Sequence, residues 1–210
     1  IPGEEEPVSP PDGVTGPMFY DIADHWAREE IEAMGEVNVV EGDPDGGFRP
    51  DDGLNRAEAA ALLYRILGLG TPEAPTEKPF SDVEVDAWYA GYVNELKDME
   101  LLFGNPDGTY EPGENINRAE FLSMAMNVYY YISDADTQSA IDDLMEGPMT
   151  DMYEDLLENQ WYTSEVTAAT EMGFVHGSVC NDGRCFYAGN EVTRAEATVM
   201  LYNMFYDYLT

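Results

Sequence analysis

Three arginines occupy the same place in a short sequence motif that recurs along this chain, which has only 9 basic residues among 210. Arg56, Arg118 and Arg194 each follow an Asn or Thr and stand two residues before a Glu. The Asn or Thr and the Glu make the pattern of a capping box, so each copy of the motif predicts a helix start. Capping does not explain the arginine, since a cation in the first turn opposes the helix dipole. A guanidinium adds a fork of donors for a carboxylate, beside helix N–H groups expected to point outward.

Cys180 and Cys185 bracket the turn-forming tetrapeptide Asn-Asp-Gly-Arg and are the two cysteines of the chain. A zinc site would need two further ligands, and both histidines lie elsewhere in the sequence. The spacing therefore favours a local disulfide. A disulfide in turn indicates an oxidising, extracellular setting.

An acidic loop in the first half of the chain offers carboxylates for a cation. Asp43, Asp45 and Asp51 lie there, although the twelve-position EF-hand pattern is absent. The same residues suit tight turns, so a calcium site and turn formation are both open interpretations. His25 and His176 have no Ser or Cys partner in a nucleophile context, and the sequence predicts neither an enzyme nor a required cofactor.

Acidic residues dominate the charge, with 43 Asp and Glu against 9 Lys and Arg and a net charge of −34. Nucleic acid is excluded as a partner, because binding it requires a basic surface. The acidity indicates either a strongly solvated surface or a specific role in cation binding. No apolar run approaches the roughly 18 residues needed to span a bilayer.

The sequence repeats one unit three times. In each unit a Gly lies 16 residues after a Trp, and the motif arginine lies 8 residues after a later aromatic residue. The positions are Trp26, Gly42, Phe48 and Arg56, then Trp88, Gly104, Tyr110 and Arg118, then Trp161, Gly177, Phe186 and Arg194. Each unit reads as helix, loop with a short extended segment, and capped helix. Units this small bury little alone, so we expect a mainly α-helical fold, with three units packed as a pseudo-threefold bundle.

Composition sets the boundaries of the units. We expect an acidic, Pro-rich arm over residues 1–17, repeats over 18–70, 80–130 and 161–210, a linker over 71–79, and a connecting segment with helical turns over 131–160. The first two repeats begin with Phe19-Tyr20-Asp21 and Phe80-Ser81-Asp82. The third has no clear Phe-x-Asp start, and Met149-Thr150-Asp151 is the nearest candidate.

Each unit resembles the S-layer homology repeat. The resemblance lies in the Phe-x-Asp start, the helix after a Trp, the Gly-x-x-Asp-Gly-x-Phe loop and the Thr-Arg-Ala-Glu motif. This resemblance implies a threefold bundle that attaches cell-surface proteins non-covalently to cell-wall polysaccharide, often bearing pyruvylated sugars. It implies an extracellular, cell-surface location and a ligand held in grooves between repeats. The motif arginine of each repeat is then expected to contact the glycan; these residues are Arg56, Arg118 and Arg194.

The resemblance extends to two further sets of residues. Asp21 and Asp82 match the early Asp of the family and either bind ligand hydroxyls or cap the helix that follows. Trp26, Trp88 and Trp161 either form the groove walls or pack in the core.

A second hypothesis makes the chain a self-assembling subunit of a surface layer, tube or filament. In this hypothesis the arm over residues 1–17 docks on another copy of the chain, head to tail. Because each subunit carries a charge of −34, such contacts are expected to need salt or Ca²⁺ between carboxylates.

Overall fold

The computed structural model describes residues 18–147, 152–181 and 183–210. Helices dominate it, which confirms the predicted fold class. The elements in chain order are the 3₁₀ helix η1 (Tyr20–Ile22), α1 (Arg28–Glu36), α2 (Arg56–Ile66), α3 (Ala90–Asp98), α4 (Arg118–Ile132), α5 (Ala135–Glu146), α6 (Thr163–Glu171), β1 (Ser178–Cys180), β2 (Gly183–Cys185) and α7 (Arg194–Leu209).

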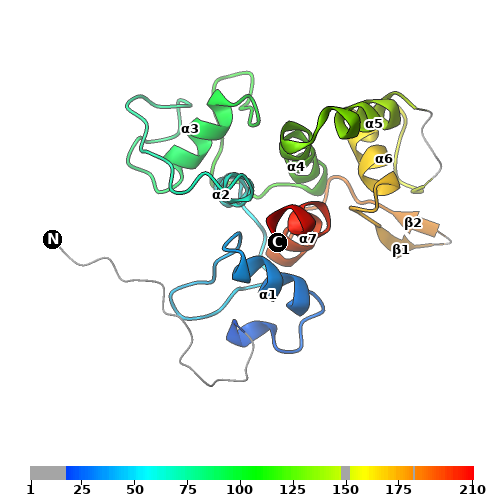
Figure 1. The fold of residues 1–210 in the computed structure, drawn as a ribbon, viewed down its shortest axis with the longest axis horizontal. Coiled ribbons are helices and arrows are strands. Elements are labelled where there is room, and N and C mark those ends of the chain that lie inside the picture. The colour runs from blue at the N-terminus through cyan, green and yellow to red at the C-terminus, as the bar shows by residue number, and fades with distance from the viewer. Residues whose placement is uncertain (1–17, 148–151, 182) are drawn as a thin grey trace.

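Three helices begin at the motif arginine and lie together at the centre of the molecule (Figure 1). We call α2, α4 and α7 the central helices. Each has the complete capping box that the sequence predicts. In α2 the Glu58 N–H donates to the Asn55 side chain at 2.9 Å, and the Asn55 N–H donates to the Glu58 carboxylate at 3.0 Å. These local signals therefore place the starts of the central helices correctly.

The outer helices α1, α3 and α6 each begin two residues after the repeat Trp. Each packs on the central helix of a different repeat: α3 on α2, α6 on α4, and α1 on α7. The second repeat thus covers the first, the third covers the second, and the first covers the third. The three repeats close into a ring around the central helices (Figure 1).

Backbone hydrogen bonds repeat this ring just before the central helices. The Leu54 N–H donates to the Val192 carbonyl at 3.0 Å, Val192 to Ile116 at 3.0 Å, and Ile116 to Leu54 at 2.9 Å. All three side chains are fully buried. Since each residue donates to the next member in one direction, the arrangement has pseudo-threefold symmetry, as predicted.

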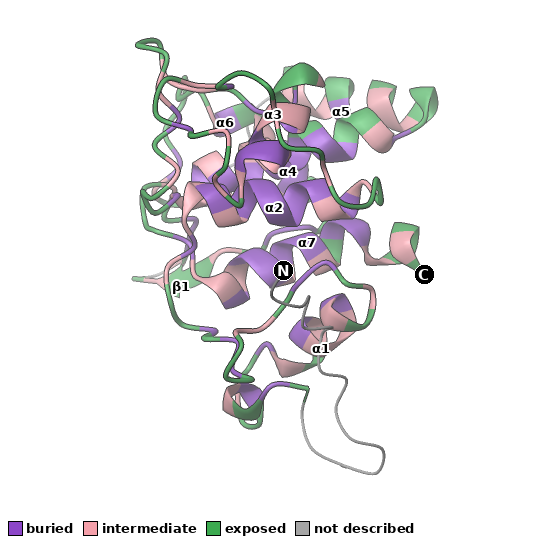
Figure 2. Cartoon of the chain, turned by 90° about the vertical axis from the view of Figure 1, so that its left-hand side faces the viewer, coloured by how far each residue is buried: buried purple, intermediate pink, exposed green. Residues whose placement is uncertain are grey.

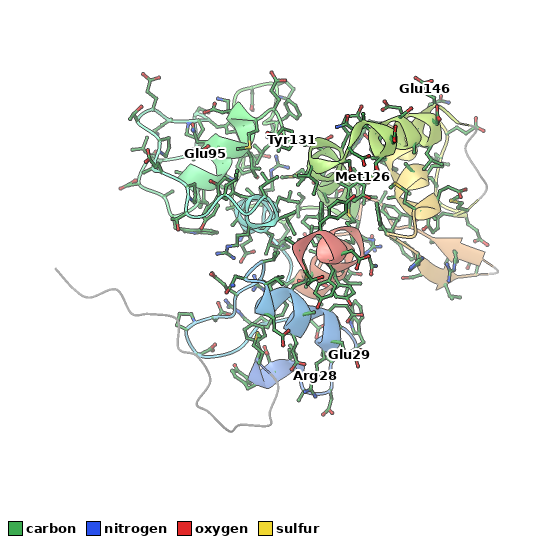
Figure 3. All side chains as sticks on the ribbon, in the orientation of Figure 1. Arg28, Glu29, Glu95, Met126, Tyr131 and Glu146 are labelled. Atoms are coloured by element: carbon green, nitrogen blue, oxygen red, sulfur yellow. A yellow bond between two sulfur atoms is a disulfide. The ribbon has the colours of Figure 1, made fainter. Side chains whose placement is uncertain are left out.

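Buried residues concentrate on the central helices α2, α4 and α7, and exposed residues lie mainly on the outer loops and outer helix faces (Figure 2). Met126 of α4 is buried at the centre, whereas Glu29 of α1 and Glu146 of α5 lie at the periphery (Figure 3). Among the described residues, no helix combines the length and the apolar character required to cross a membrane.

Regular strands are confined, in the part of the chain that the structure describes, to the antiparallel hairpin β1–β2 in the third repeat. The Cys180–Cys185 disulfide closes this hairpin, as predicted. No strand or bridge forms at Phe48 or Tyr110, where the short extended segments of the first two repeats were expected. Isolated bridges instead join residues just before the central helices, namely Gly53 with Thr193, Asn55 with Asn115, and Asn117 with Glu191. The connecting segment contains α5, which packs on α6. The predicted arm over residues 1–17 lies outside the described residues.

Candidate ligand site at the repeat junctions

Each motif arginine contacts the loop of the next repeat at the junction between the two repeats. The Nε of Arg56 donates to the Tyr110 carbonyl at 2.7 Å, that of Arg118 to the Phe186 carbonyl at 3.0 Å, and that of Arg194 to the Phe48 carbonyl at 2.8 Å. Each guanidinium also lies over the ring of the same aromatic residue, at 4.7, 5.1 and 4.8 Å from the centroid respectively. The structure thus brings the three predicted arginines to three equivalent inter-repeat positions.

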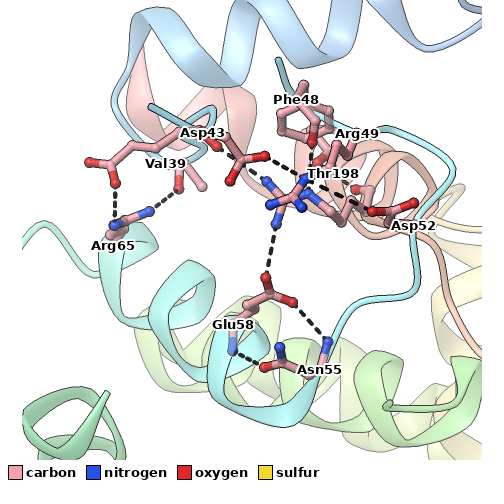
Figure 4. Close-up of polar contacts among 11 residues, drawn as sticks. Val39, Asp43, Phe48, Arg49, Asp52, Asn55, Glu58, Arg65 and Thr198 are labelled. Atoms are coloured by element: carbon pink, nitrogen blue, oxygen red, sulfur yellow. Dashed lines mark hydrogen bonds and ion pairs between the residues drawn. The ribbon is translucent and has the colours of Figure 1, made fainter. Parts of the chain in front are cut away.

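Two of these arginines form ion pairs with a capping glutamate of the neighbouring repeat. Arg118 lies 3.1 Å from Glu196, and Arg194 lies 3.3 Å from Glu58. Figure 4 shows Glu58 in contact with its cap residue Asn55 and with the guanidinium of the third repeat. The arginine forks therefore meet carboxylates of the protein itself at two junctions. Burial lowers the pKa of Arg118, although the nearby Glu196 carboxylate opposes this shift.

The helix N–H groups do not point outward to a ligand, which corrects the sequence expectation. The backbone N–H of Arg56 donates to the Glu114 carbonyl at 3.0 Å, and equivalent bonds hold Arg118 and Arg194 at 2.9 Å. Carbonyls of the next repeat accept from the following residue as well. These donors are satisfied because the ring presses each helix start against a neighbouring loop.

The early aspartates neither cap the helix after the Trp nor stand free in the structure. The Asp21 carboxylate accepts from the N–H groups of Phe48 and Arg49 at 2.8 and 2.7 Å. Burial opposes ionisation of Asp21, but these backbone hydrogen bonds outweigh it and lower its pKa. Asp82 accepts in the same way from Tyr110 and Glu111 at 2.8 and 2.7 Å. The aspartates thus fix the loop on which the arginine rests, and their binding of ligand hydroxyls stays a prediction.

The third repeat does have an equivalent start, which the sequence analysis missed. Asp155 accepts from the N–H groups of Phe186 and Tyr187 at 2.7 and 2.6 Å, as Asp21 and Asp82 do in their repeats. Tyr153 precedes it in the place of Phe, and a Cβ on Gly177 would overlap its ring. The candidate Asp151 lies outside the described residues. A search for any aromatic residue eight positions before Trp161 would have found Tyr153.

The three tryptophans lie on the surface. Trp26, Trp88 and Trp161 are 63%, 61% and 60% exposed. Core packing, one of the two interpretations of these residues, is therefore wrong. The three repeats thus expose their indoles to a similar extent, and a role of the tryptophans as groove walls stays a prediction.

The acidic loop of the first repeat gives a calcium site no geometric support among the described residues. Asp43 pairs with Arg49 at 2.5 Å, and Asp51 lies 3.4 Å from His25. Asp45 accepts from the Gly47 N–H at 3.0 Å, which is the geometry of a turn. The one described group of three ligand-type side chains that converge includes both disulfide cysteines, so it does not offer thiolates to a metal.

Comparison with known proteins agrees with this geometry. The family model described as "S-layer homology domain" matches residues 19–60 and 79–122. The first and second repeats of the chain therefore match the S-layer homology domain, as the resemblance in the sequence predicts. The third repeat has the same capping box, arginine contact and Asp-held loop, and the structure thus shows it as a further copy of the unit.

Similar proteins include the S-layer protein EA1 of Bacillus anthracis, 27% identical over 188 residues, which are 89% of this chain and 20% of that protein. Cell surface glycoprotein 1 of Acetivibrio thermocellus is 29% identical over 163 residues, 77% of this chain and 7% of that protein. An amylopullulanase of Thermoanaerobacterium thermosulfurigenes is 27% identical over 186 residues, 89% of this chain and 9% of that protein. The chain thus spans a fifth or less of the length of these relatives, and the matched part is the S-layer homology region.

These relatives indicate an extracellular location at the cell surface, which confirms the predicted setting. The S-layer homology domain is an anchoring module rather than a catalytic one. The enzyme activity named for the amylopullulanase is therefore not carried to this chain, which matches only 9% of that protein.

Proposed function

We propose that this domain binds cell-wall polysaccharide non-covalently, in grooves at the repeat junctions, and so holds a protein at the cell surface. The observation that carries the proposal is the surface position of Trp26, Trp88 and Trp161, each at least 60% exposed. Packing does not account for three large exposed rings at equivalent positions, whereas a flat indole face suits the apolar face of a sugar ring. The motif arginines add hydrogen-bond donors for acidic groups of the glycan, such as the carboxylate of a pyruvylated sugar.

The net charge of −34 opposes the approach of an anionic polymer. Salt screens this repulsion over about 10 Å at 0.1 M ionic strength. Binding of an acidic glycan should therefore strengthen as salt or divalent cations are added, and binding of a neutral glycan should not.

Replacement of the tryptophans by Ala tests the proposal. Each of Trp26→Ala, Trp88→Ala and Trp161→Ala should retain its melting temperature, because the side chain is mostly exposed, and should sediment less with purified cell walls. Phe103→Ala is the matched control: Phe103 is 66% exposed, but the other two repeats have Glu41 and His176 at that position. Unchanged sedimentation of all three tryptophan variants would contradict the proposal.

The S-layer proteins among the relatives favour a second candidate, a subunit that assembles into a surface layer, tube or filament. Docking of residues 1–17 on another copy and Ca²⁺ at subunit contacts stay predictions of this candidate. Particle images of the chain with and without residues 1–17, each in calcium and in chelator, would test it. Identical monomeric particles under all four conditions would contradict it.

A further inference from the structure

A cavity lined mainly by tyrosines lies at the far end of the central helices from the motif arginines, and we call it the tyrosine cavity. Its volume is about 310 Å³, and it is formed by the last two turns of α7, by Tyr129 of α4 and by the Gly173–Phe174 loop after α6. Arg194 begins α7 and Tyr206 lies 12 residues later, which is about 18 Å along the helix. Figure 2 shows the C-terminus on the opposite side of the molecule from β1. The tyrosine cavity is therefore separate from the repeat junctions.

The pseudo-threefold packing of the repeats does not require this cavity. The helix α2 has 11 residues, whereas α4 has 15 and α7 has 16, so α4 and α7 continue for about one more turn. Tyr129, Tyr206 and Tyr208 belong to that additional turn, at positions that have no helical counterpart in α2. The cavity is thus a feature of the second and third repeats that their shared architecture does not explain.

The aromatic rings of the cavity hold one another in fixed orientations. Tyr202 and Tyr206 stack with 4.6 Å between ring centroids and 27° between ring planes. Tyr208 stands edge-on to Tyr129 at 5.7 Å, and its hydroxyl donates to the Tyr129 hydroxyl at 3.2 Å. Tyr129 is buried and packs edge-on against Phe174 at 4.8 Å. A ligand therefore meets aromatic faces that are already ordered, which lowers the entropy cost of binding.

Two polar side chains, Asn203 and Asp207, line the cavity beside these rings, and both are exposed. The Nδ2 of Asn203 donates to the Phe174 carbonyl at 3.1 Å, which fixes the orientation of the amide. Within the described residues, Asn203 Oδ1 and the Asp207 carboxylate accept no hydrogen bond, and Asp207 has no ion pair. The cavity thus combines aromatic faces with acceptor oxygens that the protein does not use.

The lining of the cavity determines which class of ligand fits it. Asp207 is its one carboxylate, and none of the described residues that line it is Lys, Arg or His, so an anionic ligand is disfavoured. A pyranose has apolar C–H faces that pack on aromatic rings, and hydroxyls that donate to carboxylate and amide oxygens. The volume lies at the lower end of the range of about 300–1,000 Å³ for small-molecule sites, which suits a short saccharide.

We propose that the tyrosine cavity binds a neutral pyranose unit. The C–H groups of the sugar pack on the tyrosine rings, and its hydroxyls donate to the Asp207 carboxylate and to Asn203 Oδ1. This site goes beyond the proposed binding at the repeat junctions, because it takes a neutral sugar and lies at the other end of the central helices. One chain can then hold two segments of saccharide at once, and neither site needs the other.

Saturation-transfer NMR with neutral oligosaccharides tests the proposal. The probe is wall polysaccharide from the organism that makes the protein, partially hydrolysed and freed of acidic fragments on an anion exchanger. Two receptors are compared: the wild-type chain, and the full chain in which Trp26, Trp88 and Trp161 are all replaced by Ala to remove the proposed junction sites. Both receptors should transfer saturation from tyrosine ring protons to the sugar.

Matched variants assign the signal to the cavity. Tyr206→Ala should reduce the affinity for the bound oligosaccharide about 10- to 100-fold in calorimetry, and Tyr206→Phe, which keeps the ring, should stay within about threefold of the parent. Asp207→Asn should weaken binding about 10-fold, as expected for a lost charge-assisted hydrogen bond. Because Asp207 is exposed, this variant keeps the test open if Tyr206→Ala fails to fold.

Tyr131→Ala and Asp24→Asn are the controls. Tyr131 is 55% exposed near the end of α4 but does not line the cavity, and Asp24 is an exposed carboxylate of the first repeat. Both variants should bind the neutral oligosaccharides as tightly as the parent.

Several outcomes would overturn the proposal. They are the absence of saturation transfer in both receptors, or transfer that Tyr206→Ala and Asp207→Asn leave unchanged. Transfer that is seen in the wild type but lost in the triple tryptophan variant would place the neutral sugar at the junctions instead. A synthetic peptide of residues 1–17 that binds in place of the sugar, and that Tyr206→Ala releases, would assign the cavity to a second copy of the chain. Failure of the junction sites is recognised separately, since it appears as unchanged sedimentation of the single tryptophan variants.

Discussion

Replacing Asp155 with Asn should destabilise the domain, because this carboxylate holds the loop that carries Phe186. It accepts from the Phe186 N–H at 2.7 Å and from the Tyr187 N–H at 2.6 Å. An amide keeps one oxygen acceptor, turns an NH₂ donor toward the other N–H and removes the charge. The Phe186 ring is 1% exposed, so water compensates poorly there, whereas the exposed Tyr187 can turn to solvent.

The magnitude follows from one bond lost in full. A hydrogen bond to a charged group contributes about 1.5–3 kcal/mol, and we expect about 2 kcal/mol once the water gained at Tyr187 is included. For a domain of this size each kcal/mol corresponds to roughly 2–4 °C, which predicts a fall in melting temperature of about 4–8 °C. Urea unfolding should show a lower midpoint with an unchanged slope.

Asp24→Asn is the control for this experiment. Asp24 is exposed and makes no hydrogen bond or ion pair with another described residue. If Asp155→Asn and Asp24→Asn melt within about 1 °C of each other, the carboxylate of Asp155 does not hold the loop and its assignment as the start of the third repeat is wrong.

Three further predictions concern stability. Gly104→Ala should cost about 1–3 kcal/mol, because a Cβ there would overlap the first aromatic ring of the repeat and lie 2.6 Å from a backbone carbonyl, whereas Gly113→Ala, with open space around it, should be neutral in chemical unfolding. Replacing Cys180 and Cys185 together by Ser should cost about 2 kcal/mol, and a reductant should lower the melting temperature of the wild type but not of this variant. Burial raises the pKa of Glu165, whose Oε2 is buried without a hydrogen-bond partner among the described residues, so its ionisation favours unfolding as the pH rises above the unfolded value near 4.3. Glu165→Gln should therefore stabilise the domain at pH 7 and have little effect near pH 3, and an equal effect at both pH values would refute this reasoning.

Local signals made most of the fold predictable. The capping boxes at Asn55, Asn117 and Thr193 involve residues only three apart, so their chemistry can be read directly from the sequence. The disulfide was predictable for the same reason, since five positions separate its two cysteines. The constant spacing of the repeats then limited the architecture to three equivalent units.

Partners distant in the sequence were not predictable. Asp21 binds N–H groups 27 and 28 residues later, and no local pattern distinguishes this role from helix capping. The pairing of Arg194 with Glu58 spans 136 residues and depends on how the repeats close. Amphipathic periodicity shows which face of a helix is buried, but it does not identify the neighbouring repeat that covers that face. The tryptophans were ambiguous for the same reason.

The packing of α1 on α7 has a consequence for how such a domain can change its copy number over evolution. In an open array of repeats, tandem duplication adds a unit at one end and one new interface with it. Here a fourth unit would have to break the contact between the first and the third, and loss of one unit would leave two unmatched faces. Unequal recombination that inserts or deletes a single unit should therefore be eliminated by misfolding, whereas duplication of a complete triplet would produce a second closed ring.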